Sequence, residues 1–220
     1  MKLFACSDFH GARIIMDKLP QAAEMADMVL LCGDICGRKF GQPTENLPAF
    51  QRESIDYVCG LLDAAGTPYR YIYGNDDWIE TTLPARLIKP ETVNGVTLLP
   101  MDLVLPFGKH TNREAPEEEI AARLEEFTCT QTTIVVAHTP PYGACDLAAN
   151  GKRCGSTAAR EWIERNQPLA WFCGHIHEDY STDRIGRTRI FNCAVWLWET
   201  SLRGWLFDTD TGAYEKLLIP

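Results

Sequence analysis

Runs of apolar residues recur along the chain, and each is followed within a few residues by Asp, Asn or His. The clearest run covers residues 28–32 and leads directly into Gly33 and Asp34. An apolar run without alternation is typical of a strand that is buried on both faces, as in a parallel sheet. Because such sheets bind ligands just beyond the carboxyl ends of their strands, the residues that follow these runs are candidates for function.

The first half of the chain predicts alternating strands and helices. Strands are expected at residues 2–7, 28–32 and 69–73. Residues 12–25 have helical periodicity interrupted by a proline, which predicts two short helices. A longer helix is expected over 49–65, where a glycine follows and stops it. The resulting β-α-β-α-β order indicates a parallel sheet with right-handed crossovers.

The second half of the chain is richer in short β runs. Strands are expected at residues 92–99, 103–107, 133–137, 171–173, 188–194, 204–207 and 214–219. An Asn94-Gly95 pair gives a hairpin signal. Helices are expected over 116–127, which begins with a proline and three glutamates, and over 156–165. No break in composition marks a linker, so residues 1–220 are expected to form a single domain.

Composition describes an acidic globular protein. The 220 residues are 45% hydrophobic, and 30 acidic against 21 basic side chains give a net charge of −9. This charge argues against non-specific binding to nucleic acid or to an anionic membrane. It allows a small phosphorylated substrate if bound divalent metals reverse the local field. The chain has no signal-peptide core and no apolar run near the ~18 residues of a membrane span, so a cytoplasmic protein is expected.

The nine cysteines are expected to be buried, reduced thiols. Their number is odd, and most of them lie inside apolar, strand-like runs. No pair has the C-x-x-C spacing that a thiolate zinc site would need. Candidate chemistry therefore depends on the polar residues at the strand ends.

Four of the five histidines are among the residues that follow the apolar runs. The strand-end groups are Asp8, His10, Asp34, Asn75, His138, His175 and His177. Imidazole, carboxylate and amide donors without a thiolate suit Mn²⁺, Fe²⁺, Co²⁺, Ni²⁺ or Zn²⁺. The number of donors exceeds one coordination sphere, which indicates two metals, and Asp34 is the candidate for the bridging carboxylate. Such a pair lowers the pKa of a bridging water, whose hydroxide attacks phosphorus in line.

Each motif also has a structural interpretation when it is taken alone. Asp8-x-His10 fits a polar turn, the sequence GNDD at 74–77 is a strong turn signal, and His138 before two prolines fits a capping residue. The sequence GHIH at 174–177 is the most specific, since its two histidines can each face a different metal. A purely structural account requires five independent coincidences in chain order, so the metal site is favoured.

The ordered series D-x-H, G-D, G-N-x-D, H-T-P-P and G-H-x-H resembles the calcineurin-like metallophosphoesterase family over residues 8–177. The HTPPYG stretch at 138–143 and the GHIHE stretch at 174–178 look most like its small single-domain prokaryotic members. This resemblance implies an α/β fold, a four-layer α/β/β/α sandwich with two central mixed sheets. It implies one metal held by Asp8, His10, Asp34 and His177, and a second held by Asp34, Asn75, His138 and His175.

The chain departs from the family pattern at one position. The fuller motif is G-N-H-D/E, whose histidine is thought to protonate the leaving group or hold the phosphate, and here Asp76 stands in its place. An ionised carboxylate repels phosphate and is a poor proton donor unless its pKa is raised. Activity limited to good leaving groups, a donor from elsewhere and weak activity all remain open. A phosphodiesterase is expected more than a monoesterase, with Asp34, Asn75, His138 and Asp76 as its catalytic residues.

Loops are expected to select the substrate. Residues 35–48 are expected to form a loop over the site, and basic loop residues are candidates for holding a phosphate oxygen: Arg38, Lys109 and Arg153. One alternative function is a catalytically weak member of the family that acts as a protein-binding scaffold. Another is a metal hydrolase of amides or ring substrates, but such sites typically begin with H-x-H where this chain has Asp8-x-His10. The oligomeric state is left open.

Overall fold

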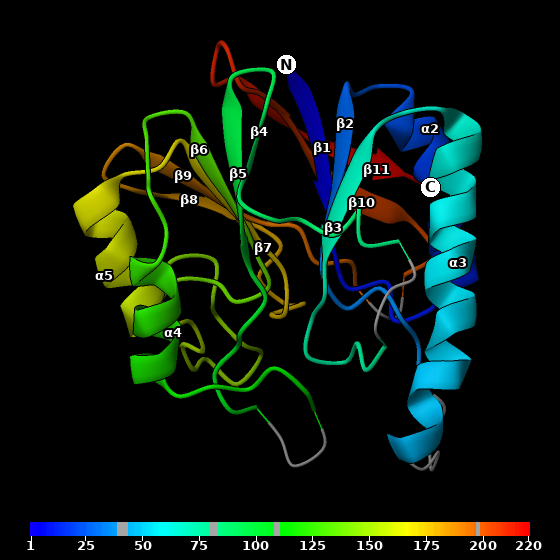
Figure 1. Cartoon of the computed structure of the whole chain (residues 1–220), viewed down its shortest axis with the longest axis horizontal. Helices are drawn as coiled ribbons and strands as arrows, with labels where there is room; N and C mark the ends of the chain where they lie inside the picture. The colour runs from blue at the N-terminus through cyan, green and yellow to red at the C-terminus, as the bar shows by residue number, and fades with distance from the viewer. Residues whose placement is uncertain (39–43, 80–82, 108–110, 197–198) are drawn as a thin grey trace.

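Two β-sheets pack face to face in the computed structural model, and helices cover the outer face of each sheet (Figure 1). The structure describes residues 1–38, 44–79, 83–107, 111–196 and 199–220. The strands are β1 (Lys2–Cys6), β2 (Met28–Cys32), β3 (Tyr69–Ile72), β4 (Glu91–Val93), β5 (Val96–Met101), β6 (Thr133–Ala137), β7 (Ala170–Cys173), β8 (Thr182–Ile185), β9 (Thr188–Asn192), β10 (Leu202–Asp208) and β11 (Tyr214–Ile219). The helices are α1 (Arg13–Met16), α2 (Leu19–Ala23), α3 (Leu47–Ala65), α4 (Glu117–Glu125) and α5 (Thr157–Asn166), with a 3₁₀ turn at Thr44–Asn46.

Both sheets are mixed. The first has the order β11-β10-β1-β2-β3, in which β1, β2 and β3 are parallel and β10 and β11 are antiparallel to their neighbours. The second has the order β4-β5-β6-β7-β9-β8, with four parallel strands in the centre and antiparallel edge strands. The four-layer α/β/β/α sandwich expected from the sequence is therefore confirmed.

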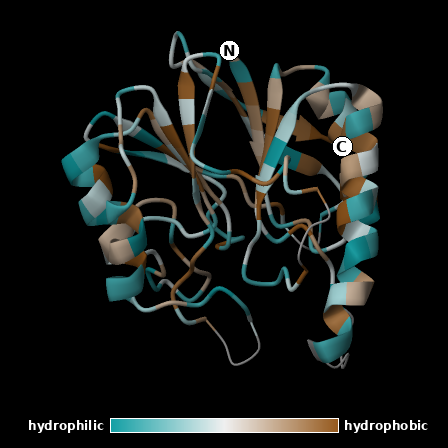
Figure 2. Cartoon of the chain, viewed as in Figure 1, coloured by the Kyte–Doolittle hydropathy of each residue, from teal (hydrophilic) through white to brown (hydrophobic). Residues whose placement is uncertain are grey.

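Three layers of apolar side chains hold the four layers of the fold together. Strand β2 shows why its sequence does not alternate: Val29 and Leu31 face α1–α3, while Leu30 points into the space between the sheets. Trp162 and Trp171 belong to the third layer, between the second sheet and helices α4 and α5. Figure 2 shows the same division, with apolar strands inside and hydrophilic residues on the outer helix surfaces.

The predicted helices and most strands are confirmed, with ends that differ by at most two residues, and two β segments differ. Residues 103–107 do not form a strand, since Val104 makes only an isolated bridge to Glu114. The expected β run over 92–99 is divided into two antiparallel strands, β4 and β5, joined at the Asn94-Gly95 turn, so the hairpin signal there is confirmed. Strand β8 was not predicted because its residues are polar or exposed except at one end, as an edge strand allows.

All nine cysteines lie in the described ranges and are free thiols, and seven of them are buried, which confirms the expectation from the sequence. Within the described residues, no helix combines the length and the apolar character that crossing a membrane requires.

Candidate metal centre

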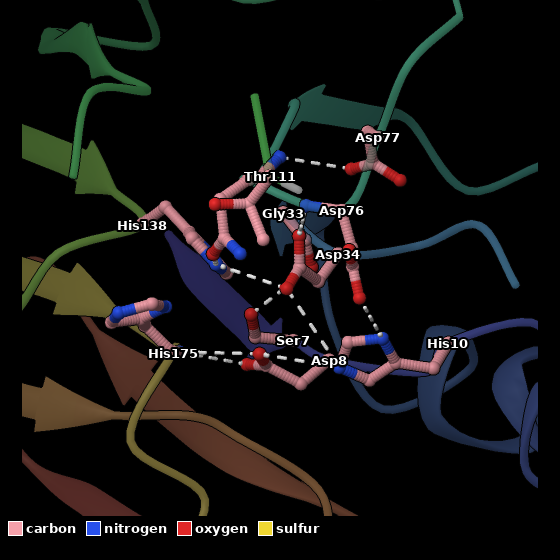
Figure 3. Close-up of polar contacts among 12 residues, drawn as sticks. Ser7, Asp8, His10, Gly33, Asp34, Asp76, Asp77, Thr111, His138 and His175 are labelled. Carbon is pink, nitrogen blue, oxygen red and sulfur yellow. Dashed lines mark hydrogen bonds and ion pairs between the residues drawn. The ribbon is translucent and has the colours of Figure 1, made fainter. Parts of the chain in front are cut away.

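The candidate site lies where the carboxyl ends of the parallel strands of both sheets meet (Figure 3). Asp8, Asp34 and Asn75 follow β1, β2 and β3 of the first sheet. His138 and His175 follow β6 and β7 of the second sheet. A cleft of about 470 Å³ opens over three of these residues, Asp34, Asn75 and His175. Its lining residues are His10, Asp34, Arg38, Asn75, Asp76, Phe107, Thr111, His175, His177, Glu178 and Trp196.

The backbone at the site adopts conformations that side chains rarely tolerate. Asp8, His10, Asp34 and His175 have φ angles of 65°, 45°, 50° and 68°, in the left-handed region. Such conformations persist only where surrounding contacts enforce them, and they concentrate at functional sites. Here the backbone N–H of His10 donates to the carbonyl of Asp34 at 3.0 Å, and that of Asp8 donates to Gly33 at 3.0 Å. These bonds fasten the loops after β1 and β2 to each other.

Two glycines allow the loops to approach the carboxylates. A Cβ atom built on Gly74 would lie 2.1 Å from Asp34 Oδ1, and one built on Gly174 would lie 2.2 Å from Asp8 Oδ2. Any larger residue would displace these carboxylates. The glycines before Asn75 and before the GHIH histidines are therefore required by packing around the site.

A first group of donor atoms is formed by Asp8, His10 and His177. His177 Nε2 lies 3.1 Å from Asp8 Oδ1 and 3.3 Å from His10 Nε2. Two atoms that each lie ~2.1 Å from one ion are about 3.0–3.4 Å apart in octahedral or tetrahedral geometry. His10 Nε2 and Asp8 Oδ1 are 3.9 Å apart, so a small movement would complete the group.

A second group is centred on His138, which is completely buried. Its Nε2 lies 3.3 Å from Asp34 Oδ2 and 3.0 Å from Asn75 Oδ1. Its Nδ1 lies 2.8 Å from the carbonyl oxygen of Cys32. Because a carbonyl can only accept, Nδ1 carries a proton, and Nε2 is the nitrogen directed at the site. Asp8, Asp34 and His138 together form a donor group of three.

Asp34 stands between the two groups. Its Oδ2 is 3.7 Å from His10 Nε2 and 3.3 Å from His138 Nε2. Its Oδ1 accepts the backbone N–H of Asp76 at 2.7 Å, which holds the carboxylate in this orientation. Asp34 also forms a third donor group with His10 and Asp76. One carboxylate is thus within reach of both candidate ion positions.

His175 is placed at the site differently from the other histidines. Its backbone N–H donates to both oxygens of Asp8 at 3.1 and 3.2 Å. Its ring lies 5.2 Å from that of His138 and 4.9 Å from that of Phe107, measured between centroids. It lines the cleft but belongs to none of the three donor groups formed by the described His, Cys, Asp and Glu residues.

The carboxylates make the site attractive to cations. Burial alone would lower the pKa of His10, but its hydrogen bond with Asp76 and the charge of Asp34 raise it to about 9. Burial likewise opposes protonation of His138, yet Asp34 raises its pKa to about 10. Asp34 has its own pKa lowered by His138 against the effect of burial. His175 has its pKa lowered to about 4 by burial and by His138.

Asp77 is a structural part of the site that the sequence analysis treated only as a turn residue. It is completely buried and accepts backbone N–H groups from Ile35, Cys36 and Gly74 at 3.3, 2.8 and 2.9 Å. These bonds join the loop after β2 to the loop after β3. In Figure 3 its carboxylate lies apart from that of Asp8. Its place as the final Asp of the G-N-x-D motif was the sequence signal that could have identified this role.

Arg203, in β10, is a second supporting residue that the sequence analysis did not identify. Its Nε donates to the carbonyl of Ala194 at 2.8 Å and its Nη2 to the carbonyl of His177 at 3.1 Å. Its guanidinium also lies over the ring of Tyr180, at 4.5 Å from the centroid. This single side chain connects the tail of the chain to the GHIH loop. No local motif marks it, because its partners are backbone carbonyls far away in sequence.

The three basic residues expected to hold a phosphate oxygen differ in where the structure places them. Arg38 lines the cleft, and its Nη2 lies 3.1 Å from Asp76 Oδ1. Arg153 pairs with the buried Asp146 at 2.6 Å and is not among the described residues that line the cleft. Lys109 lies outside the described residues. Of the three, Arg38 is the one that the structure brings to the site.

Known proteins share these features of sequence and fold. The family model for calcineurin-like phosphoesterases matches residues 1–179. Uncharacterized protein MJ1162 of Methanocaldococcus jannaschii is 30% identical over 202 residues, which cover 87% of each chain. A dimetal phosphatase from Danio rerio superposes with a TM-score of 0.59 at 13% identity, covering 100% of this chain and 98% of that one. A novel archaeal phosphodiesterase superposes with a TM-score of 0.56 at 10% identity over 100% of both chains. At these identities the two structures show a shared fold.

Proposed function

The chain belongs to the calcineurin-like phosphoesterase family, and from that premise we propose that it hydrolyses phosphodiesters with the help of two divalent metal ions. Membership of the family makes it a hydrolase of small phosphorylated substrates. The observation that carries the proposal is the convergence of donor atoms from five strand ends around Asp34. We also propose that residues 1–220 form one domain, since β10 and β11 complete the sheet that contains β1.

The residues at the site fit a pair of divalent cations. The proposed ligands of one ion are Asp8, His10, Asp34 and His177, and those of the other are Asn75, His138 and His175 together with the shared Asp34. The donor atoms around His138 and around His177 lie 3.0–3.3 Å apart, which agrees with atoms that surround one ion. Mixed imidazole, carboxylate and amide donors favour Mn²⁺ among the borderline ions, with Fe²⁺, Co²⁺, Ni²⁺ and Zn²⁺ as alternatives. When bound, such ions activate water and neutralise charge on the phosphoryl group.

The protein's own groups orient the substrate and the donors. The bond from His138 Nδ1 to the Cys32 carbonyl fixes the ring, so its Nε2 stays directed at Asp34 and Asn75. Arg38 is proposed to donate to a phosphate oxygen, and its contact with Asp76 holds the guanidinium at the rim. Asn75 is held in the second donor group by His138.

Preference for diesters follows from the negative charge that lines the cleft. Asp76 and Glu178 line it beside Arg38, and Asp76 also lies 3.5 Å from His10 Nδ1 through its Oδ2. A phosphodiester carries one negative charge, whereas a monoester at neutral pH carries close to two. Like charges raise the cost of binding, so the monoester is the poorer substrate. The cleft also lacks an imidazole at position 76 to protonate a poor leaving group.

A direct test is hydrolysis of bis-p-nitrophenyl phosphate by purified protein loaded with Mn²⁺, with the metal content measured in the same sample. We expect about two ions per chain and faster turnover of this diester than of p-nitrophenyl phosphate. Bound metal without hydrolysis of any phosphoester would favour the protein-binding scaffold. Faster turnover of the monoester would contradict the diester preference.

Metal binding is expected to release protons and to tighten as the pH rises. His10 and His138 have pKa values of about 9 and 10 in the metal-free protein, and a ligand nitrogen must be free of its proton. Because both values are raised, protonation stabilises the metal-free fold below pH 6.5, and this contribution is lost as the pH passes through 9 and 10. Calorimetric titration with Mn²⁺ at pH 7.5 in buffers of different ionisation enthalpy should show about two protons released.

The control for this titration is His10→Asn, which should release about one proton fewer than the wild-type protein. If the wild-type protein bound metal at pH 7.5 without releasing protons, His10 and His138 would not have been protonated before binding. The raised pKa values would then be contradicted.

Replacement of Arg203 is expected to weaken metal binding without touching a ligand. Arg203→Met removes the two bonds to the carbonyls of Ala194 and His177, so the His177 ring loses a support. Loss of groups that orient a ligand typically costs about 10- to 100-fold in metal affinity. Competition against a chelator would measure this loss. Arg184→Met, an exposed change on the edge strand β8, is the matched control. A folded Arg203→Met protein with wild-type affinity would show that the GHIH loop holds itself in place.

A further inference from the structure

Two aromatic side chains line the cleft without a role in the donor groups. Phe107 is 64% exposed, the highest value among the large hydrophobic side chains of the described residues. Trp196 is partly exposed and lines the same cleft. Exposed aromatic area carries an unfavourable free energy that a flat, apolar ligand group would relieve. Both rings therefore offer surface to whatever occupies the cleft.

Backbone contacts fix the positions of both aromatic residues. The N–H of Phe107 donates to Glu114 Oε1 at 3.1 Å, and its ring packs edge-on against His175 at 4.9 Å. Trp196 follows Val195, whose N–H donates to the carbonyl of Ser7 at 3.0 Å. Ser7 directly precedes Asp8, so Trp196 is tied to the same loop as a proposed ligand. Because the backbone beside each residue is already held, less conformational entropy is lost when a substrate orders the two rings than on a free loop.

The size of the cleft indicates a substrate larger than a bare phosphate. Its volume of about 470 Å³ lies in the range of ~300–1,000 Å³ that is typical of pockets for organic ligands. The phosphoryl group would lie over the donor groups, beside Arg38. The space toward Phe107 and Trp196 is then left for one of the groups that the phosphate esterifies.

We propose that Phe107 and Trp196 form a binding site for a flat aromatic ester group, so that the preferred substrates are phosphodiesters of a nucleoside or of an aryl alcohol. This inference rests on the proposed function, because it assigns the substrate class of the same cleft. Stacking on an aromatic side chain tolerates different rings, since each has a π face. The site binds aromatic esters more tightly than alkyl esters, and the identity of the ring has a smaller effect on affinity.

The test compares the binding of three phosphate monoesters to the Mn²⁺-loaded protein by calorimetry: thymidine 5′-monophosphate, phenyl phosphate and methyl phosphate. These compounds share the phosphate and differ in the attached group. We expect the two aromatic compounds to bind about tenfold or more tightly than methyl phosphate. Tighter binding of the thymidine compound than of phenyl phosphate would identify a nucleoside. Equal binding of the two would identify any flat ring.

The variant Phe107→Ala/Trp196→Ala should reduce the aromatic preference to within about threefold, while Phe107→Tyr/Trp196→Phe should keep it. Equal binding of all three compounds by the wild-type protein, or a full preference in the alanine double variant, would overturn the proposal. Since Phe107 touches His175, metal content is measured in each variant. If the double variant loses metal, the single variant Trp196→Ala decides, and an unchanged preference there overturns the role of Trp196.

Hydrolysis of methyl p-nitrophenyl phosphate by the wild-type protein is measured alongside. If no ester is hydrolysed but the aromatic preference in binding persists, the proposed function fails and the aromatic site stands. If hydrolysis proceeds without any aromatic preference in binding, the aromatic site fails alone.

Discussion

Replacing Asp34 with asparagine is expected to lower kcat/KM for bis-p-nitrophenyl phosphate by about a thousandfold or more and to reduce the bound metal. Removal of even one group that stabilises charge at an active site costs ~10²–10³ in rate, and Asp34 reaches both candidate ion positions. Asparagine keeps the shape, and its Oδ1 can still accept the Asp76 N–H that Asp34 accepts at 2.7 Å. The substitution therefore removes a negative charge with little change in the hydrogen bonds of the loop.

The measurement combines steady-state kinetics with metal analysis of Asp34→Asn. Asp183→Asn makes the same chemical change at an exposed position on β8 and should behave like the wild-type protein. Circular dichroism distinguishes a folded Asp34→Asn protein from an unfolded one. A folded variant with two bound ions and wild-type kcat/KM would show that Asp34 does not bridge the ions, and the dinuclear proposal would fail with it.

The position of the donor groups was predictable because of a general property of parallel sheets. Residues after parallel strands meet at one edge, so Asp8, Asp34 and Asn75 could be placed together from their position behind three apolar runs. The second sheet contributes His138 and His175 from its own strand ends. Five segments separated by up to 167 positions in sequence, as between Asp8 and His175, thus converge by one rule of topology.

The supporting residues could not be predicted in the same way. Asp77 and Arg203 act on backbone groups of other loops, and backbone partners leave no trace in the sequence. Arg153 was expected at the substrate as a basic loop residue that could hold a phosphate oxygen. In the structure Arg153 instead forms an ion pair with Asp146, which also accepts the backbone N–H groups of Gly143 and Gly155. A basic loop residue and a buried acid in the same loop are therefore better predicted as a pair.

The left-handed backbone at Asp8, His10, Asp34 and His175 is the feature that links fold to chemistry most closely. A residue in this conformation turns the chain sharply, so donors two residues apart can face the same side of a loop. The cost of about 1–3 kcal/mol for each strained residue must be offset by contacts such as the hydrogen bonds between the loops. Asp and His are enriched in this conformation among residues other than glycine, but propensity alone does not indicate which of them adopt it.

Replacing Asp76 with histidine is expected to raise kcat/KM for p-nitrophenyl phosphate and for alkyl monoesters by about 10- to 100-fold. The side chain lines the cleft and is 23% exposed, so an imidazole has room there. It would replace a carboxylate with a group that can protonate a leaving oxygen, a step worth ~10²–10⁴ in rate when fully developed. The largest gain should be seen with the poorest leaving groups, since these depend most on protonation.

The control for this substitution is Asp76→Asn, which removes the same charge without supplying an acid. If relief of repulsion alone were responsible, Asp76→Asn would match Asp76→His, and the gain would not depend on the leaving group. If proton donation is responsible, only Asp76→His gains, and its rate falls as the pH rises past the ordinary imidazole pKa of ~6.5 and the new imidazole loses its proton. An Asp76→His protein with no gain on any monoester would show that the missing imidazole does not limit this enzyme.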